Sequence, residues 1–240
     1  MEQQNKPTNT MGIVTVLYTH TDYSDVWEPF LNRFRKYFPD TKLYFCVNKY
    51  SENIPENCNP IYYDETKQYT ERLSECITQI GGEVVLFLHE DMILYDTPLY
   101  DKLEDYFQYV EEGTAHSIKL IPVGTIIGRP YFDSTVVHTT YSKFSIQPTI
   151  IHTHSLLQLL EEVGPNSIWE FERLVQQKGN DYVCYMGTES KRGMHHFDSK
   201  VYPYTATAIV KGKWNFMEYP VELTEILEEC NINKEIRGII

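Results

Sequence analysis

Two adjacent carboxylates, Glu90 and Asp91, stand directly after an apolar run at residues 84–88. Carboxylate oxygens are the ligands that hard cations such as Mg²⁺ and Mn²⁺ prefer, and such cations keep positions open for phosphate oxygens. His89 precedes the pair, and a neutral histidine can ligate Mn²⁺ or hydrogen-bond a ribose hydroxyl. The segment therefore indicates a site for a phosphorylated ligand. The alternative is that the two acidic side chains only cap the loop after a strand.

A second group with chemical potential is the segment Trp169-Glu170-Phe171-Glu172. Sugar rings present C–H faces that pack on aromatic rings. On a helix, Trp169 and Glu172 would share a face, which puts a carboxylate beside an aromatic platform. That carboxylate can take the proton from an attacking hydroxyl, with Glu172 as the first choice for this base and Glu170 as the second. The same spacing also fits an amphipathic helix with a buried Trp and solvated Glu side chains.

The elements that must position these groups alternate in type along the first half of the chain. Apolar, β-branched runs predict strands at residues 11–20, 42–49, 59–65, 82–94 and 116–124, and helical spacing predicts helices at 25–38, 68–80 and 99–110. Residues 84–88 are apolar without alternation, as in a central parallel strand covered on both faces. This order predicts an open α/β sheet.

The second half is less regular. We expect strands at residues 145–153 and 202–210, and helices at 155–163, 167–178 and 222–229. Ligands in open α/β sheets bind beyond the carboxyl ends of the strands. Polar residues stand at such ends in three places, residues 19–22, 64–65 and 89–91.

Length and composition narrow the class of protein. The chain has 240 residues, and we expect residues 1–10 to be a disordered lead-in and 11–240 a single domain. Its 34 acidic and 21 basic residues give a net charge of −13, which disfavours nucleic-acid binding. Five cysteines without a C-x-x-C pair favour a reducing cytoplasm. The polar first residues predict no signal peptide, and no apolar run predicts a transmembrane segment.

The segment VVLFLHEDMIL resembles the metal-binding strand end of GT-A-type glycosyltransferases, where a D-x-D motif follows an apolar strand. The segment SIQPTIIHTHSLLQLLEEVGPNSIWEFE is similar to a pattern in a bacterial and large-virus group of these enzymes. The resemblance implies a GT-A-like open, mostly parallel sheet flanked by helices, with a Rossmann-like nucleotide-binding half and a less regular acceptor half. It further implies sugar transfer from a UDP- or GDP-sugar to a glycan or other hydroxyl acceptor, in surface glycan or polysaccharide synthesis.

The resemblance also assigns residues. Asp91 matches the carboxylate that binds Mn²⁺ or Mg²⁺ and bridges to the diphosphate, Glu90 is the middle residue of the motif, and His89 stands in place of its first Asp. His196 would supply a further metal ligand. The remaining residues expected at the nucleotide are Thr19, His20, Thr21, Asp22, Asp64 and Arg72. Arg72 could instead pair with Glu71 or Glu75 on its own helix.

Further residues are weaker candidates. Gln147 would present an amide near the acceptor, Lys191 or Arg192 could neutralise the leaving diphosphate, and residues 211–214 could line the acceptor side. Two other functions stay open: a nucleotidyltransferase, and a catalytically silent member of the fold that binds a glycan or a partner. The sequence contains no P-loop, no G-x-G-x-x-G, no G-x-S-x-G and no H-E-x-x-H motif. It does not decide between inversion and retention.

Overall fold

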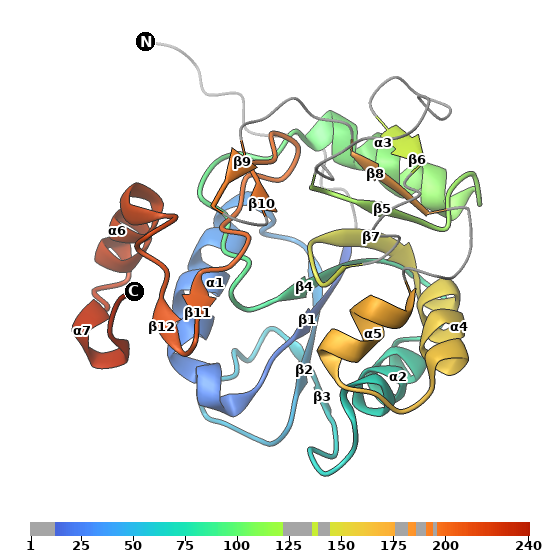
Figure 1. Ribbon diagram of the computed structural model, residues 1–240, viewed down its shortest axis with the longest axis horizontal. Coiled ribbons are helices and arrows are strands. Elements are labelled where there is room, and N and C mark those ends of the chain that lie inside the picture. Colours follow the sequence, from blue (N-terminus) through green and yellow to red (C-terminus); the bar gives the residue numbers. More distant parts are fainter. Residues whose placement is uncertain (1–12, 122–135, 139–144, 176–181, 186–190, 194–195) are drawn as a thin grey trace.

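The computed structural model describes residues 13–121, 136–138, 145–175, 182–185, 191–193 and 196–240 (Figure 1). Within these residues, the central sheet has eight strands in the order β3-β2-β1-β4-β7-β5-β8-β6. Their bounds are β1 Val14–Tyr18, β2 Lys42–Val47, β3 Asn59–Tyr62, β4 Val84–His89, β5 Ser117–Lys119, β6 Val136–His138, β7 Thr149–His152 and β8 Tyr182–Tyr185.

The direction of the strands confirms the predicted fold class. Strands β3, β2, β1 and β4 are parallel neighbours, and β5 is parallel to β8. Strand β7 is antiparallel to both β4 and β5, and β6 is antiparallel to β8. Of the eight strands described in this sheet, all but β7 and β6 therefore point the same way. The protein is an α/β structure with a mostly parallel sheet.

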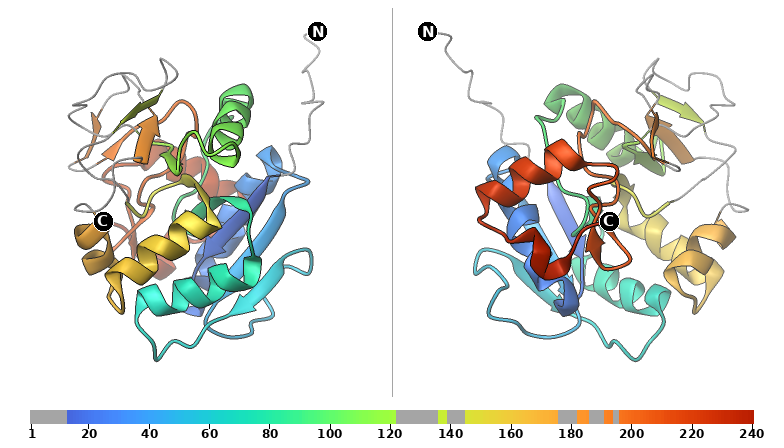
Figure 2. Two further views of the ribbon diagram at one scale, coloured as in Figure 1. Left: turned by 90° about the vertical axis from the view of Figure 1, so that its right-hand side faces the viewer. Right: turned by 60° about the vertical axis from the view of Figure 1, so that its left-hand side comes forward.

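Helices cover the strands β1 to β4 from two sides (Figure 1). One group consists of two helices in contact, α1 Ser24–Tyr37 and α6 Pro220–Glu229. The other consists of three helices in mutual contact, α2 Tyr69–Ile80, α4 Thr153–Val163 and α5 Ile168–Val175. Figure 2 shows α2 and α4 side by side. The remaining helical elements are η1 Thr21–Tyr23, α3 Tyr100–Glu111 and α7 Lys234–Arg237. Cover on both faces explains the apolar run of β4, in which residues 85–88 are fully buried.

Helix α2 shows how local sequence sets the elements that reach the site. A capping box joins Gln68 and Glu71 at its start, which satisfies backbone N–H groups that the first turn leaves open. Leu73, Cys76, Ile77 and Ile80 are buried at helical spacing on one side. Gly81 ends the helix with a φ of 86°, in the region that favours glycine.

The structure corrects the expected strand at residues 202–210. This segment instead lies irregularly across residues 91–95, because Thr205 N–H donates to Ile93 O (2.9 Å) and Ala208 N–H donates to Asp91 O (3.1 Å). Its regular part is a short hairpin, β11 Ile209–Val210 with β12 Lys213–Trp214. A second hairpin joins β9 Lys191–Arg192 to β10 His196–Phe197. The strand expected at 59–65 ends at Tyr62, ahead of its acidic residues.

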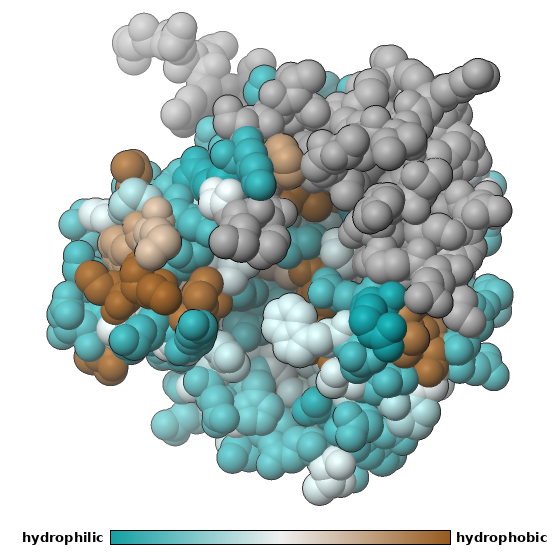
Figure 3. Space-filling view, in the orientation of Figure 1, coloured by the Kyte–Doolittle hydropathy of each residue, from teal (hydrophilic) through white to brown (hydrophobic). Residues whose placement is uncertain are grey.

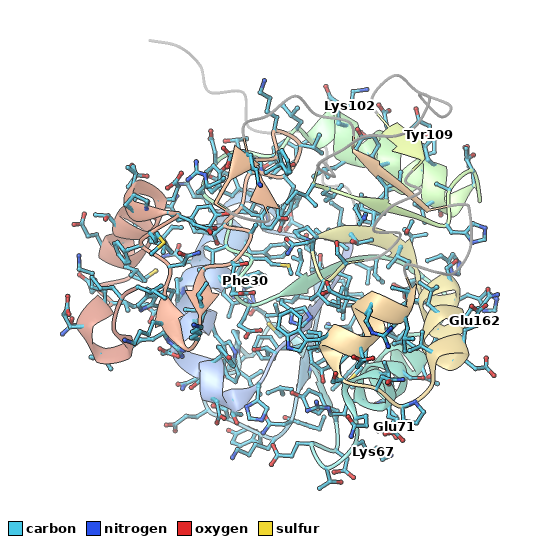
Figure 4. The ribbon with its side chains drawn as sticks, in the orientation of Figure 1. Phe30, Lys67, Glu71, Lys102, Tyr109 and Glu162 are labelled. Carbon is cyan, nitrogen blue, oxygen red and sulfur yellow. The ribbon has the colours of Figure 1, made fainter. Side chains whose placement is uncertain are left out.

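The surface of the last helices is partly apolar. Hydrophobic side chains gather over α6 and α7 in Figure 3, where Met217, Val221 and Ile236 are exposed. Phe30 of α1, by contrast, lies in the core and is 1% exposed (Figure 4). Of the helices that the structure describes, none is long and apolar enough to cross a lipid bilayer.

Candidate functional site

A pocket of about 750 Å³ opens at the carboxyl ends of β1 and β4. Its walls come from these strand ends, from β5, from the first turns of α2 and α5, and from segments 145–147 and 206–212. This is the edge at which ligands bind in open α/β sheets. Elements from both halves of the sequence therefore meet around one cavity.

The pocket brings together most of the residues singled out in the sequence. Those that line it are Thr19, His20, Arg72, His89, Glu90, Asp91, Gln147, Trp169, Glu172, Lys211 and Gly212. Among the residues expected at the nucleotide or as a base, Thr21, Asp22, Asp64 and Glu170 do not line it. The side chain of His196 lies outside what the structure describes, and His195 lies wholly outside it.

Glu90 and Asp91 sit in the turn that follows β4. The backbone of Asp91 is held in place, because its carbonyl accepts hydrogen bonds from Ala208 N–H (3.1 Å) and Thr205 Oγ1 (3.0 Å). Burial and the charge of Asp91 raise the pKa of Glu90 to about 8, and burial raises the pKa of Asp91 to about 7. Two enclosed carboxylates thus resist carrying two negative charges at once.

The pair fits a divalent cation. Glu90 Oε2 is buried and has no hydrogen-bond partner among the described residues, which is unusual for a polar atom in a folded protein. Within the same residues, no cluster of three or more His, Cys, Asp or Glu side chains could hold a metal. In the part of the chain that the structure describes, the pocket therefore offers two adjacent carboxylates without a closed cage of ligands. Magnesium is commonly held in this way, with phosphate oxygens and water completing its shell.

His89 presents a neutral ring to the pocket. Burial lowers the pKa of His89 to about 3, so the imidazole is uncharged near neutral pH. Its Nε2 lies 3.3 Å from the hydroxyl of Tyr69, and its ring lies 5.5 Å from that of Tyr18. These aromatic neighbours explain the loss of solvent around the ring. A neutral ring adds no positive charge to offset the two carboxylates.

Tyrosines line the neighbouring wall, and sequence reasoning missed them individually. Tyr18 stacks on Tyr63 with ring centroids 5.0 Å apart, and Tyr69 meets Tyr18 edge-on at 5.2 Å. The hydroxyl of Tyr63 donates to the carbonyl of Thr19 (2.6 Å), which fixes the end of β1. The only sequence signal was the high tyrosine content, which did not say which rings gather.

Arg72 reaches this tyrosine wall from α2. Its guanidinium lies over the ring of Tyr63 at 5.4 Å, and its Nε is buried without a hydrogen-bond partner among the described residues. The alternative pairing on α2 is not seen, because Glu71 caps the helix and Glu75 pairs with Lys67. Lys67 and Glu71 lie together at the start of α2 in Figure 4. Arg72 therefore faces the pocket.

The loop after β1 is held by polar contacts. Thr19 Oγ1 accepts from Trp27 Nε1 (2.7 Å), so this hydroxyl anchors α1. Thr21 N–H donates to Asn48 Oδ1 (2.9 Å), and Asp22 N–H donates to His20 Nδ1 (3.1 Å). His20 Nε2 lies 3.1 Å from Glu65 Oε2.

The acidic residues after β3 lie differently from the prediction. Asp64 accepts hydrogen bonds from the backbone and side chain of Thr66 (3.0 and 2.7 Å), so its carboxylate is used within its own turn. Glu65, the next residue, instead contacts His20 at the pocket. The reason is that β3 ends at Tyr62, which leaves Asp64 in the turn rather than at the strand end.

Helix α5 contributes a carboxylate and an aromatic ring to the pocket. Glu172 is half-buried, its Oε1 accepts from Ile146 N–H (2.5 Å), and burial raises its pKa. Trp169 is 75% exposed at the same pocket, so its ring is available to a ligand. Glu170 points elsewhere and pairs with Arg173 at 2.6 Å. Of the two carboxylates on α5, Glu172 lies at the pocket and Glu170 does not.

Lys119 is a pocket residue that sequence reasoning missed. It is 1% exposed and ends β5 between two fully buried residues, Ile118 and Leu120. A single lysine within an apolar strand was the signal that could have found it. Gln147, on the adjoining wall, accepts from Tyr204 Oη through Oε1 (2.6 Å), so its NH₂ group is the one that can donate to a ligand.

The cations expected at a leaving diphosphate, Lys191 and Arg192, do not line the pocket, whereas part of the segment 211–214, expected on the acceptor side, does. Arg192 is tied to Asp198 (2.9 Å) and Glu222 (2.6 Å), and neither it nor Lys191 lines the pocket. Lys211 and Gly212 do line it, at the tip of the β11–β12 hairpin. The second half of that hairpin turns away, and Trp214 is fully buried.

Comparisons with known proteins give likenesses in structure only. No family model matches the sequence, and no curated protein matches it. A UDP-glucose pyrophosphorylase complexed with UDP-glucose is 12% identical over 72% of this chain and 90% of its own, with a TM-score of 0.47. TarS from S. aureus is 15% identical over 91% of this chain and 39% of its own, with a TM-score of 0.48.

A third similar structure is the mannosyltransferase PcManGT from Pyrobaculum calidifontis in complex with GDP-Man and Mn²⁺. It is 13% identical over 79% of this chain and 62% of its own, with a TM-score of 0.44. At these identities and scores the likeness is one of general shape. Any function must therefore be derived from the residues of the pocket.

Proposed function

We propose that the protein is a glycosyltransferase that moves a sugar from a nucleotide-diphosphate sugar to a hydroxyl acceptor. The observation that carries this proposal is that one pocket holds two different kinds of carboxylate site. Glu90 and Asp91 form an open pair suited to a cation, while Glu172 stands beside an exposed aromatic ring, Trp169. A donor phosphate and an acceptor hydroxyl have separate places in such a pocket.

The donor side is built for a nucleotide. Tyrosine side chains and the Arg72 guanidinium line this side of the pocket and offer hydrogen-bond donors to a base or ribose. Glu90 and Asp91 are the residues that would hold Mg²⁺ or Mn²⁺. When bound, the cation neutralises negative charge that develops on the departing diphosphate.

The acceptor side supplies a base and a platform. The carboxylate of Glu172 accepts the proton of the attacking hydroxyl if the reaction inverts configuration. The ring of Trp169 packs against the C–H face of an acceptor sugar. By extension, the biological setting we propose is the synthesis of surface glycans or polysaccharides.

Donor binding tests the proposal. Thermal unfolding is followed with a panel of UDP- and GDP-sugars, with and without Mn²⁺. We expect one donor to raise the Tm in a metal-dependent way, and Asp91→Asn to abolish this shift while the fold survives. The control is Asp96→Asn, which alters an exposed aspartate of the following loop that does not line the pocket. A lack of any shift, with every donor and in both metal conditions, would contradict the proposal.

Product analysis separates the two other candidate functions. With pyrophosphate added, a nucleotidyltransferase converts the bound nucleotide-sugar into a nucleoside triphosphate. A glycosyltransferase instead releases a nucleoside diphosphate as the sugar passes to an acceptor or, slowly, to water. Binding without any turnover, over a panel of hydroxyl acceptors, would identify a silent member of the fold.

A further inference from the structure

Lys119 carries a positive charge in a buried strand at the wall of the pocket. It is the last residue of β5, its neighbours in sequence are fully buried, and it is itself 1% exposed. Taking an ammonium group out of water is costly unless an opposite charge or hydrogen bonds compensate. Because Lys119 lines the pocket, its charge acts on the titratable groups that face the same cavity.

The charge of Lys119 acts on Glu172. Burial raises the pKa of the Glu172 carboxyl, and the hydrogen bond from Ile146 N–H and the charge of Lys119 each lower it again in part. The two side chains come from elements far apart in sequence and line the same pocket. Tyr69 of α2 also senses this carboxylate, because its pKa is raised by burial and then by the charge of Glu172. Tyr69 is a neutral phenol at neutral pH and contributes no competing charge.

One short segment ties both residues in place. Ile146 N–H donates to Glu172 Oε1 (2.5 Å), and two residues later Pro148 O accepts from Leu120 N–H (2.8 Å). Lys119 itself stands opposite Thr149 in the pairing of β5 with β7. The backbone of residues 146–149 therefore fixes the carboxylate and the strand that carries the lysine relative to each other.

We propose that Lys119 is a positioning residue whose ammonium group keeps the Glu172 carboxylate ionised and oriented toward the pocket. This inference rests on the proposed function for its chemical consequence. In that reaction the acceptor hydroxyl gives its proton to Glu172 as its oxygen bonds to the sugar carbon. The bond from that carbon to the diphosphate oxygen breaks, and its electron pair stays on the diphosphate. Lys119 keeps its proton throughout.

The physical reason is a balance between charge state and basicity. Burial raises the pKa of a carboxyl and so lowers the fraction that is ionised and able to accept a proton. A nearby ammonium group restores the ionised form at the expense of some basicity. Methionine at position 119 keeps the length of the side chain and removes the charge, whereas arginine keeps the charge.

The decisive experiment titrates Glu172 directly and needs no enzyme activity. The ¹³C resonance of the Glu172 carboxyl is identified in protein labelled at the glutamate δ-carbon as the signal lost in Glu172→Gln. We expect Lys119→Met to move its titration midpoint upward, because the variant removes a charge that lowers the pKa of this carboxyl. Lys119→Arg should leave the midpoint close to that of the wild type.

Ser117→Ala is the matched control. Ser117 lies two residues earlier on the same face of β5, is fully buried and does not line the pocket. Its substitution should leave the midpoint unchanged. A midpoint that stays in place in Lys119→Met, or moves equally in Ser117→Ala, overturns the inference.

Two further readouts keep the inference testable on its own. The acid limb of the pH profile of kcat/KM should shift upward in Lys119→Met, with activity recovering at higher pH. A raised KM at every pH, with an unmoved titration, would mean that Lys119 binds substrate instead. If no transfer activity is found but the midpoint moves, the proposed function fails and the charge coupling stands.

Folding is controlled by a double-mutant cycle. If Lys119→Met loses thermal stability because it leaves the carboxylate uncompensated, adding Glu172→Gln should restore the Tm. Additive losses in the double variant would show that the two charges do not interact and would overturn the inference.

Discussion

Glu90→Gln is expected to make the ligand-free protein more stable at alkaline pH. The substitution replaces a buried carboxyl by a neutral amide of nearly the same shape. The folded protein holds the pKa of Glu90 at about 8, against 4.5 in an unfolded chain. A raised carboxyl pKa has no effect on stability below the unfolded value, where both states bind the proton. As pH rises from 4.5 toward 8, the unfolded state ionises first and the folded state loses stability.

The size of the effect follows from the shift. Each pK unit corresponds to about 1.4 kcal/mol, so the shift from 4.5 to about 8 sets an upper bound of roughly 5 kcal/mol on the penalty. Part of this shift comes from the repulsion between the two carboxyls, so it belongs to the pair rather than to Glu90 alone. We therefore expect a gain of about 1–3 kcal/mol in the free energy of unfolding of Glu90→Gln above the folded pKa.

Urea unfolding at a pH near 4.5 and at a pH above 8 measures this gain. Glu161→Gln, an exposed position on α4, is the control and should show little change at either pH. Mg²⁺ is expected to stabilise the wild type more than Glu90→Gln, because the cation removes the penalty that the carboxylate imposes. A variant less stable than the wild type above pH 8, or a gain independent of pH, would refute the reasoning.

Three other substitutions give distinct outcomes. Trp169→Ala should leave the free energy of unfolding within about 0.5 kcal/mol, since the side chain is 75% exposed, while steady-state kinetics show a higher KM for the acceptor. Arg237→Ala removes hydrogen bonds to Asp25 (2.7 Å) and to the carbonyl of the pocket residue Gly212 (3.2 Å), so calorimetry should show a loss of about 1–3 kcal/mol and weaker donor binding. His89→Gln should slow the loss of stability as pH falls from 6.5 toward 3, because the wild-type imidazole is neutral when folded and the unfolded chain takes up the proton first. Acid denaturation curves that coincide with the wild type would contradict this last expectation.

Local pattern was enough to predict the part of the site that depends on one strand. Residues 84–88 are apolar without alternation, and such a run can be covered on both faces only in the middle of an α/β sheet. The carboxylates that follow it must then emerge at the ligand edge. Helical spacing on α5 gave Trp169 and Glu172 in the same way, since both lie at the pocket.

Contacts between distant segments were beyond the same reasoning. Residues 202–208 have strand-like composition, but their backbone hydrogen bonds go to residues 91–95. Pro203 lies in this segment and interrupts regular pairing, because a proline has no N–H to donate to a neighbouring strand. Lys119 lines the pocket from the end of β5, which lies beyond β7 in the sheet. Local sequence does not reveal this order of the strands. Asp64 was misplaced because its strand ends earlier than its apolar pattern suggests.

The electrostatics of the pocket constrain what it can bind. The chain carries a net charge of −13, so an anionic ligand would approach against a repulsive field. Near neutral pH, Glu90 and Asp91 have raised pKa values and together hold a proton that a cation would displace. A diphosphate alone would be repelled by these carboxylates once they ionise. A divalent cation would offset the charge of the diphosphate, so we expect the proposed donor to reach the carboxylates as a cation–diphosphate complex, with less repulsion than the diphosphate alone.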